Sequence, residues 1–354
     1  MSRLLLLLIA AAPSFAATPC LQATSACTEW VAIAGGPARS MIYRTYSLDT
    51  ANPQITRALI MIHGTNRDAD NYYRNALASA FLAGALEDTV VIAPRIASHD
   101  RGCNDTLAPN EVSYSCGGDS WRSGGTSASN DKITSFDFID EVLRKLAARK
   151  AFPNLKHIVV AGHSAGGQFV NRYEMANQIH ETLGVPVTYV VANPSSYAYP
   201  DNTRPTAADW PVSAGAPGYF PTAENARAAA TPGPVFRPFG DGRNCTTYDQ
   251  WPYGFEHRSG YTARLSDDQL KKQLASRPTT YLVGEIDILP LGGFDSSCAA
   301  MAQGPTRLAR GIAFAKFVSS KLGGRVEATI VPECGHNARC MFTDEKSLPI
   351  LFPR

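Results

Sequence analysis

The sequence predicts an α/β fold, in which a mostly parallel central sheet carries helices on both faces. Short apolar runs rich in β-branched residues alternate along the chain with longer segments of helical periodicity. A Gly-rich turn joins one such run, 156–161, to a helical segment at 168–180. The length of 354 residues, 44% of them hydrophobic, permits one elaborate α/β domain or two small ones.

The expected elements follow in order along the chain. Strands are expected at 39–48, 55–62, 89–93, 156–161, 186–192, 280–283 and 326–331, and helices at 68–85, 133–150, 168–180 and 306–322. The Gly-, Ser- and Cys-rich stretch 98–130 is expected to be loop. Residues 193–278 hold many Pro, Gly and aromatic residues, with one short helical candidate at 267–276, and so indicate a functional insertion. We predict a single domain, 17–354, with a cap- or lid-like insertion at about 194–278.

The N-terminus is typical of a secretory signal peptide, predicted to span 1–16. Arg3 precedes an apolar run at 4–12, and Ser14 and Ala16 are small residues suited to a cleavage site. The apolar run is too short to cross a bilayer as a helix. Lipid attachment at Cys20 is the alternative, although the residues before it are a poor lipoprotein signal. The mature protein is expected to be secreted, extracellular or periplasmic, without stable membrane insertion, and monomeric.

The cysteine content also favours an oxidising compartment, since all eight cysteines lie downstream of residue 16. Their spacing suggests the disulfides Cys20–Cys27, Cys103–Cys116 and Cys334–Cys340, which leaves Cys245–Cys298. A metal site is the alternative, but the sequence has no Cys-x-x-Cys pair and its histidines do not cluster with cysteines, so we expect no metal. A formal charge of +2 without a basic run argues against nucleic acid as a partner.

The Gly-rich turn reads Gly162-His163-Ser164-Ala165-Gly166 and stands between a predicted strand and a predicted helix. This Gly-x-Ser-x-Gly pattern in that context is typical of a nucleophile elbow, a sharp turn that holds a serine at the carboxyl end of a sheet. The bare pattern is common, so the flanking strand and helix carry the inference. Ser164 is the expected nucleophile, and the side chain of His163 is expected to point away from the reaction.

A serine nucleophile needs a base and an acid, which must lie on other loops at the carboxyl ends of the strands. His336 follows the last predicted strand and is the expected base; its alternative is a polar residue on a disulfide-bound loop. Asp287 follows the predicted strand 280–283 and is the expected acid, although it could merely cap a turn. Glu285 and Asp295 are its rivals.

Two backbone N–H groups are expected to form an oxyanion hole. Ala165 follows the nucleophile at the start of a helix, where its N–H is free and the helix dipole favours negative charge. Thr65 lies in the motif His63-Gly64-Thr65-Asn66 after an early strand. Asn66 is a weaker candidate for the same role, and a plain turn is the alternative for the whole motif.

Substrate contacts are expected from loops around this site. Trp121 could form a hydrophobic wall and Arg122 could bind a carboxylate, or both could simply pack and solvate their loop. Trp251 belongs to the insertion, whose many aromatic residues would line an apolar cleft or form the core of the insertion itself. His163 is a further candidate because it adjoins Ser164.

The order Ser164, Asp287, His336, together with the His63-Gly64 turn and the elbow, resembles the α/β-hydrolase superfamily over essentially all of the chain after residue 16. The resemblance implies a Ser-His-Asp hydrolase without metal or organic cofactor, often with a cap inserted where 194–278 lies. Within the superfamily the chain looks most like secreted bacterial esterases and polyester depolymerases. The expected substrate is therefore a small-molecule or polymeric carboxylic ester. An amidase or peptidase with the same triad, and a non-catalytic ligand-binding protein, remain the alternatives.

Overall fold

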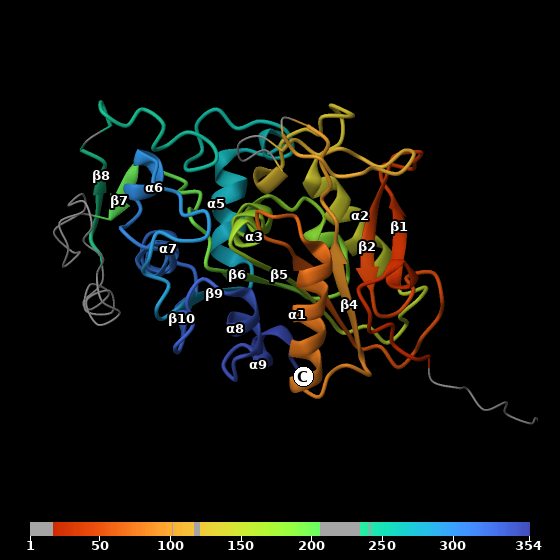
Figure 1. Cartoon of the computed structure of the whole chain (residues 1–354). Helices are drawn as coiled ribbons and strands as arrows, with labels where there is room; N and C mark the ends of the chain where they lie inside the picture. The colour runs from red at the N-terminus through yellow and green to blue at the C-terminus, as the bar shows by residue number, and fades with distance from the viewer. Residues whose placement is uncertain (1–16, 101, 117–120, 206–233, 241) are drawn as a thin grey trace, which may run out of the picture.

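An eight-stranded sheet forms the centre of the molecule (Figure 1). The structure is a computed structural model, and it describes residues 17–100, 102–116, 121–205, 234–240 and 242–354. The strand order is β1-β2-β4-β3-β5-β6-β9-β10. These strands are β1 (Thr28–Ala32), β2 (Arg39–Arg44), β3 (Arg57–Ile62), β4 (Thr89–Pro94), β5 (His157–His163), β6 (Val187–Ala192), β9 (Thr279–Gly284) and β10 (Ala328–Val331). Strand β2 runs antiparallel to β1 and β4, and the other pairs of this sheet are parallel. The predicted, mostly parallel sheet is confirmed.

Helices cover both faces of the sheet, as predicted. One face packs against α1 (Ala69–Leu82), α8 (Ala338–Thr343) and α9 (Leu348–Leu351), and the other against α2 (Ser135–Ala147), α3 (Ala165–Ala176), α5 (Asp267–Ser276) and α7 (Arg307–Leu322). Side chains alternate along each buried strand, so Leu59 and Met61 of β3 face α1 while Ile60 and Ile62 face the opposite layer. A short helix, α6 (Cys298–Met301), precedes α7.

The structure contains two features that the sequence did not predict, strand β1 and a small hairpin. Strand β1 lies at the edge of the sheet and buries only Val31 fully, so its sequence lacks the apolar pattern of the central strands. The hairpin pairs β7 (Thr203–Pro205) with β8 (Phe236–Pro238) inside the insertion. Its strands of three residues are too short to produce a recognisable alternation.

Three aromatic residues of the insertion, Tyr197, Tyr199 and Phe236, pack onto α7. The ring centroid of Tyr197 lies 4.5 Å from that of Phe314, and those of Tyr199 and Phe236 lie 4.9 and 5.3 Å from that of Phe317. These three rings join the main hydrophobic core, whereas Phe239 and Tyr248 pack on each other, with ring centroids 4.7 Å apart. Three further aromatic residues of the insertion, Trp210, Tyr219 and Phe220, lie outside the described residues.

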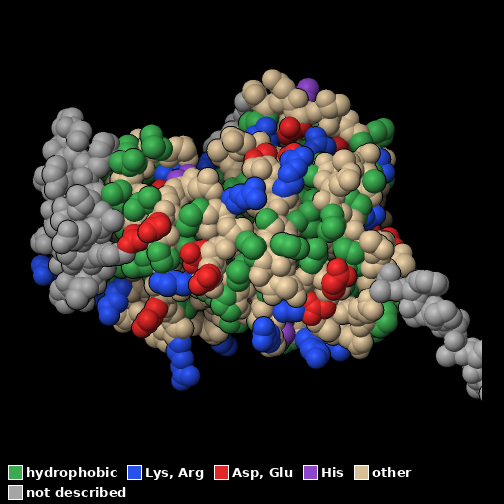
Figure 2. Space-filling model, turned by 60° about the horizontal axis from the view of Figure 1, so that its bottom comes forward, with side chains coloured by type: hydrophobic (Ala, Val, Ile, Leu, Met, Phe, Trp, Pro, Cys, Tyr) green, Lys and Arg blue, Asp and Glu red, His purple; other side chains and the backbone are tan. Residues whose placement is uncertain are grey.

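The eight cysteines lie at disulfide-bonding distance in the four predicted pairs, Cys20–Cys27, Cys103–Cys116, Cys245–Cys298 and Cys334–Cys340. The third pair ties the insertion to α6, and the fourth closes the segment that contains His336 onto α8. The predicted signal peptide, 1–16, lies outside the described residues. Within the described ranges, the helices are too short or too polar to span a bilayer, and no group of three potential metal ligands occurs. Figure 2 shows one face of the molecule, on which basic and acidic side chains are interspersed.

Candidate active site

Ser164 stands in the sharp turn between β5 and α3, with backbone angles of φ 60° and ψ −120°. A non-glycine residue at positive φ is strained, and the packing around the turn must hold it there. Two glycines permit this packing. A Cβ on Gly162 would collide with the carbonyl of Gly166, and a Cβ on Gly166 would collide with the carbonyl of Ile62. The strand–turn–helix geometry that the Gly-x-Ser-x-Gly pattern predicts is therefore present.

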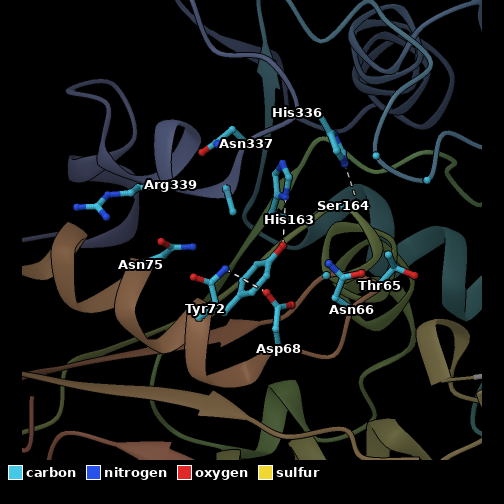
Figure 3. Close-up of a pocket in the computed structure, with 15 residues that line it drawn as sticks. Thr65, Asn66, Asp68, Tyr72, Asn75, His163, Ser164, His336, Asn337 and Arg339 are labelled. Atoms are coloured by element: carbon cyan, nitrogen blue, oxygen red, sulfur yellow. Dashed lines mark hydrogen bonds between the residues drawn. The ribbon is translucent and has the colours of Figure 1, made fainter. Parts of the chain in front are cut away.

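Ser164, His336 and Asp287 lie in one hydrogen-bonded chain, of which Figure 3 shows Ser164 and His336. The Oγ of Ser164 is 2.9 Å from Nε2 of His336, and Nδ1 of His336 is 2.8 Å from Oδ2 of Asp287. With its proton on Nδ1, the imidazole donates to the carboxylate and accepts from the hydroxyl. The two rival acids are engaged elsewhere, because Glu285 accepts from the Glu333 N–H and Asp295 accepts from the Tyr253 hydroxyl.

Arg307, at the start of α7, holds the other side of Asp287, and the sequence analysis did not identify it. Its guanidinium is fully buried and places Nη1 3.4 Å from Oδ1 of Asp287. It also donates from Nε to the Ser195 hydroxyl at 2.8 Å and from Nη2 to the Gly292 carbonyl at 3.0 Å. Burial lowers the pKa of Arg307, while the charge of Asp287 opposes that shift. One cation thus connects the acid with the loops after β6 and β9.

The Gly64–Thr65 turn lies beside Ser164, and His63 anchors it from behind. The buried His63 ring pairs Nδ1 with the Gly64 carbonyl at 2.9 Å and accepts at Nε2 from the Ile96 N–H at 3.2 Å. Burial lowers the pKa of His63 to about 4, so the ring is neutral at pH 7. The backbone N–H groups of Thr65 and Ala165 have no hydrogen-bond partner among the described residues. Both are available to a bound oxyanion.

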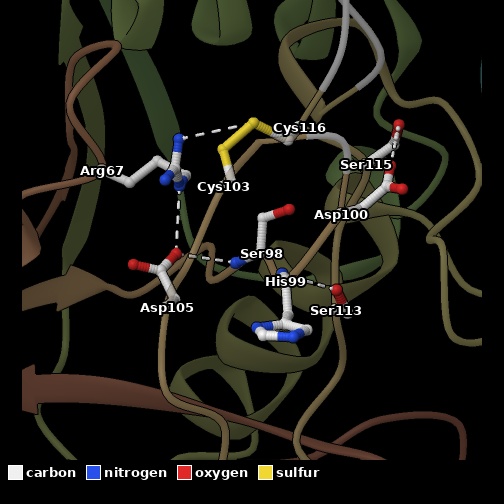
Figure 4. Close-up of a disulfide and its surroundings, with 9 residues drawn as sticks. All are labelled: Arg67, Ser98, His99, Asp100, Cys103, Asp105, Ser113, Ser115 and Cys116. Carbon is white, nitrogen blue, oxygen red and sulfur yellow. Dashed lines mark hydrogen bonds and ion pairs between the residues drawn. A yellow bond between two sulfur atoms is a disulfide. The ribbon is translucent and has the colours of Figure 1, made fainter.

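A disulfide-closed loop braces the same turn (Figure 4). Arg67 follows the turn at a φ of 55° and donates from Nε to Oδ2 of Asp105 at 3.1 Å, inside the segment that Cys103–Cys116 closes. The same Asp105 oxygen accepts from the Ser98 N–H at 2.8 Å. Burial would raise the pKa of Asp105, but the Ser98 N–H and Arg67 together lower it. The carboxylate is therefore ionised at neutral pH and fixes Arg67.

A pocket of about 550 Å³ opens beside Ser164 and His336. Apart from these two residues, its walls carry mostly polar side chains, among them Asn66, Asp68, Tyr72, Asn75, Asn337 and Arg339. His163 also lines it, with its ring centroid 4.6 Å from that of His336 and Nδ1 3.3 Å from the Tyr72 hydroxyl. The expectation that His163 points away from the triad is therefore wrong. Burial, followed by the charges of His336 and Arg307, lowers its pKa well below the usual value, so this ring is neutral.

The other predicted substrate-binding residues do not line this pocket. Trp121 begins a 3-10 turn (Trp121–Ser123), is 4% exposed and packs with its ring 5.1 Å from that of His63. Arg122 donates to the side-chain oxygen of Gln168 on α3 at 3.0 Å. Trp251 is half-buried against the main core. Contact of these three residues with substrate stays a prediction.

Comparisons with known proteins agree with this architecture. Residues 59–346 match the model of the alpha/beta hydrolase family. Poly(aspartic acid) hydrolase-1 from Sphingomonas sp. KT-1 is similar at a TM-score of 0.58 and 19% identity, over 92% of this chain and 98% of that one. The poly(3-hydroxybutyrate) depolymerase LpqC from Bordetella parapertussis has a TM-score of 0.56 and 19% identity, over 92% and 94% of the two chains. No curated protein matches the sequence significantly. At such identities the solved structures establish the fold alone.

Proposed function

The chain belongs to the alpha/beta hydrolase family, and from this premise we propose that it is an exported serine hydrolase that cleaves carboxylic esters through an acyl-enzyme. One observation carries the proposal. The imidazole of His336 has the Ser164 hydroxyl 2.9 Å from one nitrogen and the Asp287 carboxylate 2.8 Å from the other. This is the arrangement that activates a serine toward a carbonyl carbon. The four cysteine pairs at bonding distance support export to an oxidising compartment.

Each residue of the site has a role in the proposed reaction. His336 takes the proton of Ser164 as Oγ attacks the ester carbonyl, and Asp287 stabilises the imidazolium that forms. The N–H groups of Thr65 and Ala165 donate to the oxyanion of the tetrahedral intermediate. His336 then gives the proton to the leaving alcohol. Water, deprotonated by the same imidazole, attacks the acyl-enzyme and releases the acid.

The decisive experiment combines covalent labelling with turnover. We expect a fluorophosphonate probe to label the wild-type protein, and we expect p-nitrophenyl acetate to be hydrolysed. The Ser164→Ala variant should lose labelling and about 10⁴-fold or more of kcat/KM, since the nucleophile is gone. A circular dichroism spectrum equal to that of the wild type shows that the variant folds. Labelling that persists in Ser164→Ala would mean that another residue is the nucleophile.

The choice between ester and amide needs its own assay. The two solved structures described above are named as a polyester depolymerase and a poly(aspartic acid) hydrolase, so the fold serves both classes. The p-nitrophenyl ester and the p-nitroanilide of one acyl group differ only in the leaving atom. Each enzymatic rate is divided by the rate at which the same compound hydrolyses without enzyme. We expect this corrected rate to be at least 100-fold higher for the ester than for the anilide. Comparable corrected rates would make the protein an amidase or peptidase instead.

A further inference from the structure

The pocket beside Ser164 is walled by two helical segments that face each other across it. Asp68, Tyr72 and Asn75 come from α1 and the residue before it, whereas Asn337 and Arg339 come from α8 and the residue before it (Figure 3). Its volume of about 550 Å³ is within the usual range for small-molecule sites. Such sites are ordinarily lined by apolar side chains with a few polar groups. In this pocket, polar side chains outnumber apolar ones.

Asn75 is the most informative of these side chains. It is 6% exposed and is one of the residues that line the pocket. Its backbone carbonyl accepts from the Ser79 hydroxyl at 2.9 Å, but its carboxamide has no hydrogen-bond partner among the described residues. Its carboxamide atoms are not among the fully buried unpaired atoms, so water in the pocket can reach them, and a ligand that replaces this water can form hydrogen bonds in its place. The carboxamide of Asn75 therefore offers an unused donor and an unused acceptor to whatever enters the pocket.

The charges around the pocket select for a neutral occupant. Asp68 and Arg339 are its acidic and basic residues, one of each, so neither an anion nor a cation is favoured overall. Asp68 is also engaged, since it accepts from the side chain of Asn71 at 3.0 Å. Apart from two imidazoles, three glycines and Ala338, the remaining wall residues carry amides and hydroxyls, which pair with groups that both donate and accept. Hydroxyl groups are of this kind, whereas an alkyl chain would leave the carboxamide unpaired.

We propose that this pocket binds the polyhydroxylated part of the substrate, so that the enzyme prefers esters of sugars and related polyols, and that Asn75 determines this preference. The proposal rests on the proposed function of the same site. It concerns recognition alone, because Asn75 does not touch the triad in any hydrogen bond of the structure. A carboxamide can bind two hydroxyl groups at once, one through its oxygen and one through its nitrogen.

The test compares two acetate esters of primary alcohols, 6-O-acetyl methyl glucoside and hexyl acetate, by acetate release. The ratio of their kcat/KM values does not depend on the fraction of active protein. For the wild type we expect kcat/KM to be at least ten-fold higher for the sugar ester than for hexyl acetate. In Asn75→Leu, which keeps the side-chain size and removes the hydrogen bonds, this ratio should fall about ten-fold. Asn52→Leu is the matched control. Asn52 is 5% exposed, pairs with the Gln54 N–H and does not line the pocket, so its variant should keep the wild-type ratio.

Two further measurements separate the outcomes. Hydrolysis of p-nitrophenyl acetate reports on the triad, and its absence in the wild type would overturn the proposed function itself. If the wild type hydrolyses it but shows a ratio near one or below, the proposed preference is wrong while the proposed function stands. An unchanged ratio in Asn75→Leu, or in Asn75→Ser should the leucine variant not fold, would remove Asn75 from the recognition. A stronger preference for an anionic ester than for the sugar ester would also contradict the proposal.

Discussion

Gly292 touches the imidazole of His336 where the loop after β9 turns back at a φ of +58°. A Cβ added at this position would lie 2.9 Å from Cδ2 of the ring, closer than such atoms approach in real proteins. The ring or the loop would have to shift, which disturbs the position of the imidazole relative to Ser164. Since a displacement of about 1 Å in a reacting group can cost about 100-fold in rate, we expect Gly292→Ala to lower kcat/KM for p-nitrophenyl acetate by that order.

The neighbouring glycine separates the clash from the backbone strain. Gly293 has a φ of +69°, but its added Cβ would meet only the Cγ2 of Thr65 at 3.9 Å, an ordinary contact. Both alanine variants are expected to lose similar stability in thermal unfolding, because both place a side chain at positive φ. We expect the activity loss of Gly292→Ala to exceed that of Gly293→Ala at least ten-fold. Equal losses would show that strain, not contact with His336, is responsible.

Helix α7 contributes to the site through its first turn. Arg307 binds the oxygen of Asp287 that His336 leaves unused, so its positive charge competes with the imidazolium for the carboxylate. In Arg307→Met this competition is removed and protonated His336 gains stability. We expect the acid limb of the pH profile of kcat/KM to move to higher pH, together with a marked loss of thermal stability because the buried carboxylate of Asp287 loses one of its two partners.

Arg310, one turn along the same helix, is the control. It is also fully buried and donates to the Ser195 and Gly304 carbonyls, but it does not contact Asp287. Arg310→Met should lose stability and keep the wild-type acid limb. A shift of the same size in both variants would reduce Arg307 to a structural role.

These arginines also show where inference from sequence stops. Ser164, Asp287 and His336 were predictable because each follows a recognisable strand, and the carboxyl ends of parallel strands meet at one edge of a sheet. The helix 306–322 was predicted correctly, but its apolar pattern does not indicate that Arg307 and Arg310 are buried. One signal was available, because Arg307 and Arg310 stand in the first turn of the helix, where the helix dipole disfavours cations, so their presence there points to a role other than helix stability.

The polar pocket was beyond prediction for a related reason. Apolar periodicity identifies the buried face of a helix but does not show which polar residue on another face meets a second helix. Along 68–85 the apolar pattern does not even identify the buried face correctly. Phe81 and Leu82 are 71% and 56% exposed, whereas Asn75 is buried. The contact between α1 and α8 joins segments more than 250 residues apart in sequence, which local patterns do not reveal.

For the molecule as a whole, buried titratable groups act on stability in opposite directions as the pH changes. Burial lowers the pKa values of His63 and His180 to about 4, so their contributions to stability are lost as pH falls from 6.5 toward 4. Burial raises the pKa of Asp140 to about 6 and that of Glu174 to about 7. Because the folded state keeps these carboxyl protons longer than the unfolded state, their contributions are lost as pH rises through those values. The two effects partly cancel in mildly acidic solution.

Glu174 on α3 allows one of these contributions to be isolated. Its carboxyl accepts from the Asn171 amide and the Tyr281 hydroxyl, both at 2.9 Å, and a glutamine oxygen can accept the same bonds. Between pH 4.5 and about 7 the wild-type folded state binds more protons than the unfolded state at this residue, so its free energy of unfolding falls as pH rises. Glu174→Gln has no such dependence. Relative to the wild type, the variant should therefore gain stability from pH 5 to pH 8, by an amount on the order of 3 kcal/mol at most.

Urea unfolding of both proteins at pH 5 and pH 8 measures this difference directly. The control is Glu181→Gln, because Glu181 is ion-paired with Arg277 and its pKa is lowered, although burial alone would raise it. That carboxylate is ionised at both pH values in the folded state and, for the most part, in the unfolded state. The difference in free energy of unfolding between the wild type and Glu181→Gln should therefore change little from pH 5 to pH 8. An unchanged difference for Glu174→Gln as well would mean that the folded protein holds this glutamate ionised at pH 5. The buried histidines would then make the fold sensitive to acid, with Asp140 as the opposing carboxyl group.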